Sequence, residues 1–311
     1  MLKLVQNEWM KCWARKGTWV MAGLLVVLVA GMLGLTKWVA SSEGTEDWRS
    51  AVQEELAGVQ ELAQDPTLTA GEKEQLMGEE KVLEYRLAHD IAPIDSNSRE
   101  GIIMDSAGIG SIAVLFTVIV AAGIVASEFS QGTIKMLLSR PVKRWKVLTS
   151  KYVAVVAFGI LLMFIGFAIS IIGAYILFPS GGGQELVWNG QEVVTASIWG
   201  KGLYLLLLSF ANVFIIATFS FMIGSVFRSS SLAIGLSLFI YFMGSTVVVL
   251  LSKYEFVKYI VFTHMDLTMY ETGYQIVEGI TLPFSLAVLA VYLVLFLVIS
   301  YSTFTRRDVA A

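Results

Sequence analysis

Six stretches of this chain are long, apolar and free of Asp, Glu, Lys, Arg and His, apart from Lys37 near the end of the first. They cover residues 19–38, 108–127, 152–178, 202–227, 232–251 and 282–304. About 20 helical residues cross the hydrocarbon core of a bilayer, where every backbone polar group must be hydrogen-bonded within the protein. A membrane β-barrel would instead show alternating segments of about 10 residues. We therefore expect an all-α, polytopic membrane protein with six transmembrane helices.

The distribution of charge between the connecting segments predicts the orientation of the chain. If the N-terminus is cytoplasmic, the segments on that side, including the tail at residues 305–311, hold 13 basic and 3 acidic residues. The other side holds the remaining 9 basic and 22 acidic residues. Cytoplasmic loops of membrane proteins are enriched in Lys and Arg, so we expect both termini on the cytoplasmic side of a bacterial plasma membrane. The first apolar run is too long for a cleaved signal peptide, and we interpret it as a true span.

The sequence lacks the usual signs of a membrane-embedded enzyme or an ion-coupled transporter. Charged residues make up only 15% of the chain, and none lies inside a span, where proton relays and ion pathways need them. There is no G-x-x-x-x-G-K-[ST] loop for ATP and no H-E-x-x-H motif for zinc. We therefore expect no enzymatic activity, cofactor, metal or nucleic-acid partner on this chain, and energy for any uphill transport must come from another subunit.

The N-terminal segment, residues 1–18, has the pattern of an amphipathic helix lying in the membrane interface. Its apolar face contains Leu2, Val5, Trp9, Cys12 and Trp13, and its polar face contains Lys3, Asn7, Lys11 and Arg15. Tryptophan prefers the interface, and cationic side chains approach anionic headgroups. We expect Lys3, Trp9, Lys11, Trp13 and Arg15 to contact the lipid bilayer. The alternative is a simple positive-inside anchor.

Residues 128–151, between the second and third spans, carry the most specific pattern in the chain. This segment includes a short amphipathic stretch that Pro141 ends, and its pattern is E-F-x-x-G-T-I-K-x-L-L-x-R-P-V-x-R from Glu128 to Arg144. It resembles the cytoplasmic loop of type-2 ABC exporter (ABC-2) permeases. Six spans, an interfacial N-terminal helix and the ending Phe304-Thr-Arg306-Arg307-Asp308 agree with that family.

The resemblance implies that this loop contains a coupling helix that docks into a cytoplasmic ABC ATPase subunit, which would bind ATP and Mg²⁺. It assigns ATPase coupling to Glu128, Phe129, Gly132, Thr133, Lys135, Leu138, Arg140 and Pro141. It also implies a second permease chain, identical or different. The alternative is a loop whose Lys and Arg only fix the topology.

The remaining segments are expected on the outside. In residues 39–107, helical spacing from Trp48 to Ala63 and a capping box at Thr69–Glu72 predict a helical hairpin that ends near Pro93. It could act as a gate, bind a substrate or accessory protein, or be a solvated spacer. In residues 179–201, three glycines from Gly181 indicate a flexible turn. Residues 252–281 are too polar for a span, and related permeases place short re-entrant helices there, with Asp266 near the exit.

The function that follows is a permease subunit of an ABC exporter for an amphipathic or lipophilic substrate, such as a peptide, an antibiotic or a lipid-linked molecule. Two other classes remain open. One is an ion-coupled secondary transporter or channel, which the charge-free spans disfavour. The other is a non-transporting membrane sensor or anchor whose acidic outer hairpin binds a ligand.

Overall fold

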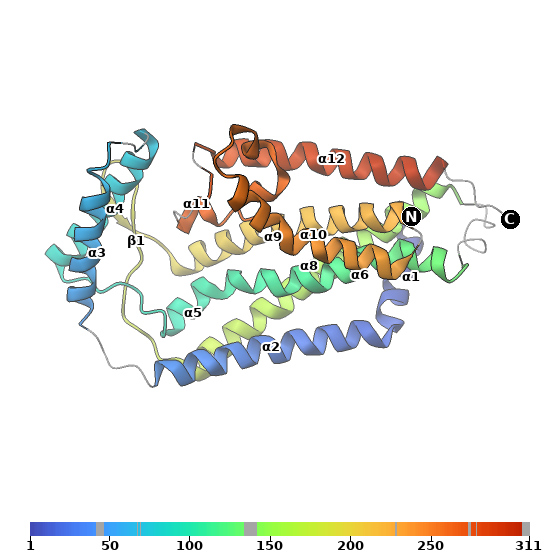
Figure 1. The fold of residues 1–311 in the computed structure, drawn as a ribbon. Helices are drawn as coiled ribbons and strands as arrows, with labels where there is room; N and C mark the ends of the chain where they lie inside the picture. The colour runs from blue at the N-terminus through green and yellow to red at the C-terminus, as the bar shows by residue number, and fades with distance from the viewer. Residues whose placement is uncertain are drawn as a thin grey trace. The chain divides into compact units, whose positions relative to one another are not determined.

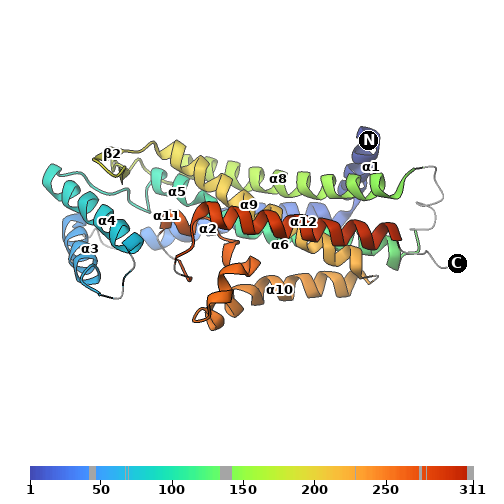
Figure 2. The same ribbon diagram turned by 90° about the horizontal axis from the view of Figure 1, so that it is seen from above.

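The computed structural model describes residues 1–41, 47–66, 68, 70–133, 142–227, 229–272, 275–277 and 279–306, and most of these residues are helical (Figures 1 and 2). The long helices are α1 (Leu2–Ala14), α2 (Lys16–Ala40), α3 (Trp48–Leu62), α4 (Ala70–His89), α6 (Gly110–Ser130), α8 (Arg144–Leu177), α9 (Ile198–Val226), α10 (Ser230–Leu251) and α12 (Leu282–Arg306). The short elements are α5 (Arg99–Asp105), η1 (Ser106–Ile109), β1 (Leu186–Trp188), β2 (Val193–Thr195), η2 (Glu255–Tyr259), η3 (Val261–His264) and α11 (Met269–Thr272).

The expected fold class is confirmed. In the part of the chain that the structure describes, six helical segments are long and apolar enough to cross a membrane. They are Lys16–Ala40, Arg99–Ser130, Arg144–Leu177, Ile198–Val226, Ser230–Leu251 and Leu282–Arg306. Each covers one of the apolar runs recognised in the sequence, except that α8 and α9 end one residue before their runs do, and α8 begins well before its run.

The chain forms two compact units. The first consists of Met1–Val27, Gly108–Gly166 and Leu206–Ala311, and the second of Leu28–Ala107 and Phe167–Leu205. The helices α2, α8 and α9 each contribute residues to both units, so each unit is described by itself below.

In the first unit, α6 is the most enclosed helix, with 15 of its 21 residues buried. The helix α10 packs along α6. The helix α9 approaches α6 so closely that a Cβ on Gly224 would collide with the carbonyl oxygen of Ala122. On α8, a Cβ on Gly159 would lie 3.0 Å from a methyl carbon of Val213. Lipid is as apolar as a leucine side chain, so helices associate in membranes by close packing, which small residues permit.

The segment between α10 and α12 contains η2, η3 and α11 and belongs to the same unit. Its Val257, Met269 and Ile280 form an apolar cluster with Val248 of α10, and Phe284 of α12 packs against this cluster. The cluster fixes the short helices to the ends of two spans.

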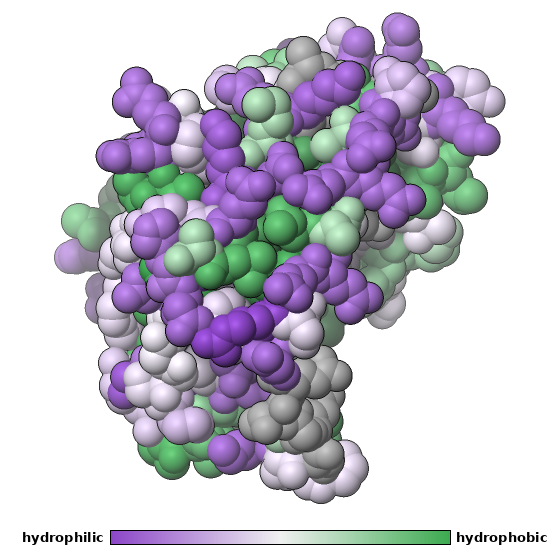
Figure 3. Space-filling model, turned by 90° about the vertical axis from the view of Figure 1, so that its left-hand side faces the viewer, coloured by the Kyte–Doolittle hydropathy of each residue, from purple (hydrophilic) through white to green (hydrophobic). Residues whose placement is uncertain are grey.

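In the second unit, α3 and α4 lie side by side as the helical spacing predicts (Figure 1). Val52 and Val59 of α3 and Leu83 of α4 form the buried centre, and Asp47 caps α3 by accepting a hydrogen bond from the backbone N–H of Arg49 at 3.2 Å. Thr69, the first residue of the predicted capping box, lies outside the described residues. The face that Figure 3 shows is mostly hydrophilic around a smaller apolar area, as expected for helices with one buried stripe.

The segment after α8 differs from the flexible turn that its glycines indicate. A Cβ on Gly181 would press against Ser98, and one on Gly183 would collide with the carbonyl oxygen of Pro93. These glycines are therefore places of close backbone approach. They precede a hairpin in which β1 and β2 pair antiparallel. Trp188 of β1 lies against α4, with the ammonium of Lys81 3.9 Å from its ring centre.

Candidate functional site

The most unusual side chain of the first unit is Lys151 of α8, which is 1% exposed. Its ammonium donates to Glu8 Oε2 of α1 at 2.7 Å and to Glu128 Oε1 of α6 at 2.6 Å. Lys11 reaches the same carboxylates, Glu8 Oε1 at 3.0 Å and Glu128 Oε1 at 3.5 Å. We call these four residues the ion network. A buried charge is tolerated when it is paired and hydrogen-bonded, and the network does this for one lysine and two carboxylates.

The charges of the network stabilise one another. Burial alone would raise the pKa of Glu8, but attraction and hydrogen bonds from Lys151 and Lys11 outweigh it, and the pKa lies below its usual value. Glu8 is therefore ionised at neutral pH. With two carboxylates against two ammonium groups, the network is neutral.

The network holds together the ends of several helices, and we call this region the α1 end of the first unit. Arg15, just after α1, donates to the hydroxyl of Ser127 on α6 at 3.3 Å. At the start of α8, Arg144 donates to the carbonyl oxygen of Thr305 on α12 at 3.3 Å. The second half of α1, the end of α6, the first part of α8 and the end of α12 thus meet in one region.

The residues assigned to ATPase coupling divide into two groups. Glu128 belongs to the ion network, and the ring of Phe129 lies edge-on to Phe304 of α12, with centres 6.3 Å apart. Gly132 has φ +72°, and its N–H donates to the carbonyl oxygen of Phe129, so it ends α6 in the left-handed conformation that favours glycine. The Thr133 hydroxyl adds a bond to the carbonyl oxygen of Glu128 at 3.4 Å. The other predicted coupling residues lie outside the described residues: Lys135, Leu138, Arg140 and Pro141.

The residues expected in the membrane interface also divide. Lys3 is exposed, whereas Lys11 pairs with the ion network while keeping 44% of its side chain exposed. Trp13 packs edge-on against Trp9, Trp19 and Phe158 of α8, with ring centres 5.0–5.9 Å apart. One face of α1 therefore packs on the protein, with Glu8 and Cys12 buried there.

The sequence alone does not single out Glu8 and Lys151 as members of one site. In the sequence, both are charges of segments that connect or precede the spans. The available signal was the placement of Glu128 and Lys151, opposite charges at the two ends of one segment between two spans. No group of three or more His, Cys, Asp or Glu suited to a metal occurs among the described residues.

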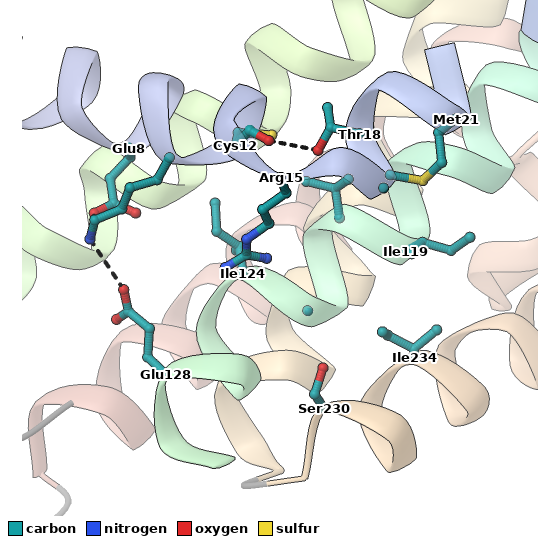
Figure 4. Close-up of a pocket in the computed structure, with 14 residues that line it drawn as sticks. Glu8, Cys12, Arg15, Thr18, Met21, Ile119, Ile124, Glu128, Ser230 and Ile234 are labelled. Atoms are coloured by element: carbon teal, nitrogen blue, oxygen red, sulfur yellow. Dashed lines mark hydrogen bonds and ion pairs between the residues drawn. The ribbon is translucent and has the colours of Figure 1, made fainter. Parts of the chain in front are cut away.

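A cavity of about 150 Å³ lies beside the network (Figure 4). Charged side chains line one end, where Figure 4 shows Glu8, Arg15 and Glu128. Apolar side chains, including Ile119 of α6 and Ile234 of α10, line the other end.

A second polar cluster lies near the opposite end of α12. His264 Nε2 lies 2.8 Å from the carbonyl oxygen of Lys258, and a carbonyl only accepts, so the network assigns the ring proton to Nε2. His264 Nδ1 therefore accepts from the Ser285 hydroxyl at 2.5 Å, and the Ser285 oxygen accepts from Tyr270 at 2.5 Å. Burial lowers the pKa of His264. With His264 and Ser285 fully buried, this chain of hydrogen bonds fixes η3 and α11 to α12.

Comparison with known proteins places the chain among membrane proteins. Residues 72–310 match the family described as "Protein of unknown function (DUF2705)". The chain is 36% identical over 316 residues to "Uncharacterized protein YhcI" of Bacillus subtilis (strain 168), and the alignment covers 100% of both chains. It is 29% identical over 196 residues to "Uncharacterized membrane protein YdbK" of the same strain, covering 62% of this chain and 76% of that protein.

Proposed function

This chain belongs to the DUF2705 family, and we propose, from its own sequence and geometry, that it is the membrane-spanning permease subunit of an ATP-driven exporter of the type-2 ABC kind. The substrate is amphipathic or lipophilic, and the α1 end faces the cytoplasm of a bacterial cell. A separate ABC ATPase binds and hydrolyses ATP with Mg²⁺. Two permease chains and two ATPase copies form the transporter.

The observation that carries this proposal is the pairing of Glu128 with Lys151 across the ends of the 128–151 segment. An ATPase that moves a coupling helix must transmit the motion to the spans. Here the two ends of the segment are bonded to each other, and through Glu8 to α1. A displacement of the segment would therefore move α6, α8 and α1 together, and switching between inward and outward access requires rigid elements of this kind.

The contacts of Phe129 and Gly132 refine the proposed docking surface. Phe129 packs against Phe304 of its own chain and Gly132 ends α6, so both support the base of the segment. We therefore propose that the apolar and basic side chains further along the 128–151 segment contact the ATPase. Among them, Leu138 is the residue to substitute first.

Co-purification tests this proposal. The tagged chain, extracted from its native host in mild detergent, should bring down a protein that contains a G-x-x-x-x-G-K-[ST] loop. Leu138→Glu places a carboxylate in the apolar contact and should reduce the recovered ATPase at least tenfold. Met77→Glu makes the same kind of change at a 53% exposed position of α4 and should leave recovery unchanged.

Two results would contradict the proposal. One is the absence of any ATPase from the wild-type preparation. The other is equal recovery with Leu138→Glu and Met77→Glu, since the apolar side chain of the segment would then not be part of the contact.

A further inference from the structure

We propose that the cavity at the α1 end binds the headgroup of an anionic phospholipid whose alcohol carries free hydroxyls, and that phosphatidylglycerol is its occupant. The phosphate would pair with Arg15, a headgroup hydroxyl would donate to Glu128, and the acyl chains would leave along the apolar end. This inference does not depend on the exporter proposal.

The cavity has the size and polarity of a binding site for a small polar group. Its volume of about 150 Å³ is close to that of cavities that hold a ring-sized organic molecule. Cavities that stay empty are lined by apolar side chains, whereas polar cavities are filled by water or a ligand. With Glu8, Lys11, Arg15 and Glu128 in its lining, this cavity belongs to the second kind.

Glu128 requires a hydrogen-bond donor from the cavity. The residue is 8% exposed, and its Oε1 accepts from Lys151. Among the described residues, its Oε2 has no hydrogen-bond partner although it is buried. A buried carboxylate oxygen without a hydrogen-bond donor destabilises the folded protein. A hydroxyl of the headgroup would provide the missing donor.

Arg15 is exposed, and its positive charge favours an anion in the cavity. In the described part of the chain, its guanidinium has the neutral Ser127 hydroxyl as a partner and no carboxylate within ion-pair distance. The ion network is neutral by itself, so Arg15 leaves the site with one uncompensated positive charge. A phosphodiester carries one negative charge, and arginine binds phosphate with two parallel hydrogen bonds.

The apolar end distinguishes a lipid from a free phosphate. Met21 of α2, Ile119 and Ile234 line the cavity away from the charged groups (Figure 4). On α2 the neighbouring Trp19 is 64% exposed, as expected for a side chain that faces lipid. A ligand with a phosphate at one end and hydrocarbon at the other matches both ends of the cavity, and it would enter from the bilayer.

The net charge and the hydrogen-bond donors of a phospholipid headgroup together decide which headgroup fits the cavity. Phosphatidylglycerol has one negative charge and two hydroxyl donors, so it matches both Arg15 and Glu128. Phosphatidylethanolamine has donors but no net charge, so the site would keep its positive charge. Phosphatidylcholine has neither net charge nor an N–H or O–H donor.

Native mass spectrometry of the full chain in detergent tests the inference. The protein is titrated with phosphatidylglycerol, phosphatidylethanolamine and phosphatidylcholine that carry identical acyl chains. We expect one saturable site with affinity in that order, with phosphatidylglycerol at least about tenfold tighter than phosphatidylcholine. Equal retention of the three lipids, or no saturable lipid in any titration, would overturn the proposal; the second result would indicate a cavity filled by water.

Two variants and one matched control locate the site. Arg15→Gln removes the positive charge and should weaken phosphatidylglycerol binding about tenfold. Ile234→Trp fills the apolar end and should abolish the saturable site. Lys16→Gln removes the same charge one residue later, at an exposed position that does not line the cavity, and should bind as the wild type does. Equal loss in Arg15→Gln and Lys16→Gln would indicate a diffuse surface effect and would overturn the proposal.

Discussion

Lys151 is the side chain of the first unit on which the charge balance of the ion network most directly depends. It is the one cation that bonds directly to both Glu8 and Glu128 at less than 3 Å in the described part of the chain. Without it, two carboxylates on α1 and α6 would share the half-exposed Lys11. Removing one partner of a buried ion pair leaves an uncompensated charge, which costs more than the intact pair contributes.

We predict that Lys151→Met lowers the free energy of unfolding by about 3 kcal/mol, because two buried carboxylates lose their shared ammonium. Thermal unfolding of the purified protein in detergent, followed by tryptophan fluorescence, measures this effect. Lys146→Met, on the same helix with its ammonium 5.6 Å from the Trp145 ring centre, should change stability by less than about 0.5 kcal/mol.

The double variant Glu128→Gln, Lys151→Met separates loss of charge balance from loss of packing. It removes one charge of each sign, so its stability should recover partway toward that of the wild type. If the double variant is as unstable as the sum of its two single variants, the residues are not coupled and the network does not act as described.

At the scale of single elements, hydrophobic spacing predicted local structure well. The period of apolar residues from Trp48 to Ala63 predicted α3, and the core of Val52, Val59 and Leu83 confirms that prediction. The hairpin of β1 and β2 was missed, although Asn189-Gly190 between two short stretches of apolar and β-branched residues is a turn signal. The strands are only three residues long, so their signal in the sequence is much weaker than that of the six long apolar runs.

The segment between α10 and α12 should respond to pH through His264. Burial depresses its folded-state pKa below the ordinary value of 6.5, so its contribution to stability is complete above about pH 6.5 and is lost as the pH falls toward and through the folded pKa. A protonated Nδ1 can only donate, so the hydrogen bond between His264 and the Ser285 hydroxyl would have to reverse its direction. As the pH is lowered from about 7.5 to 5.5, we expect the free energy of unfolding to decrease by up to about 1.4 kcal/mol per pH unit, and the thermal midpoint to fall with it.

The other histidine provides the control for this prediction. The chain has two histidines, and His89 is exposed on α4, stacked on Tyr85 at 3.9 Å between ring centres. His264→Phe should flatten the pH dependence, whereas His89→Phe should retain it. Equal slopes for the two variants would show that carboxylates, and not His264, produce the effect.

At the scale of the whole molecule, the sequence predicted the number and character of the spans because hydropathy is a property of composition along the chain. It could not predict that Glu8 and Lys151 meet, since they are 143 residues apart and their contact depends on how helix ends are oriented. The same holds for the cavity, which residues of α1, α2, α6 and α10 line together.

The orientation in the membrane is a prediction of the charge distribution, and cysteine labelling tests it. In a Cys12→Ser background, which has no other cysteine, we expect Met77→Cys on α4 to react with an impermeant maleimide on intact cells. Lys143→Cys, exposed just before α8, should react only after the membrane is permeabilised. The reverse pattern would place the α1 end outside and contradict the topology.

The contact between Glu8 and Lys151 also has a consequence for biosynthesis. Glu8 is made 143 residues before its lysine, and at about 5–20 residues per second this is a delay of roughly 7–30 s. For most of that delay, neither Lys151 nor Glu128 has yet been made, so α1 lacks both of its partners. Because α1 carries tryptophans and lysines, we expect it to lie on the membrane surface during this interval. On this prediction, the sequence of α1 has to suit two environments in succession: the lipid interface during synthesis, and the helix bundle after the third span has been inserted.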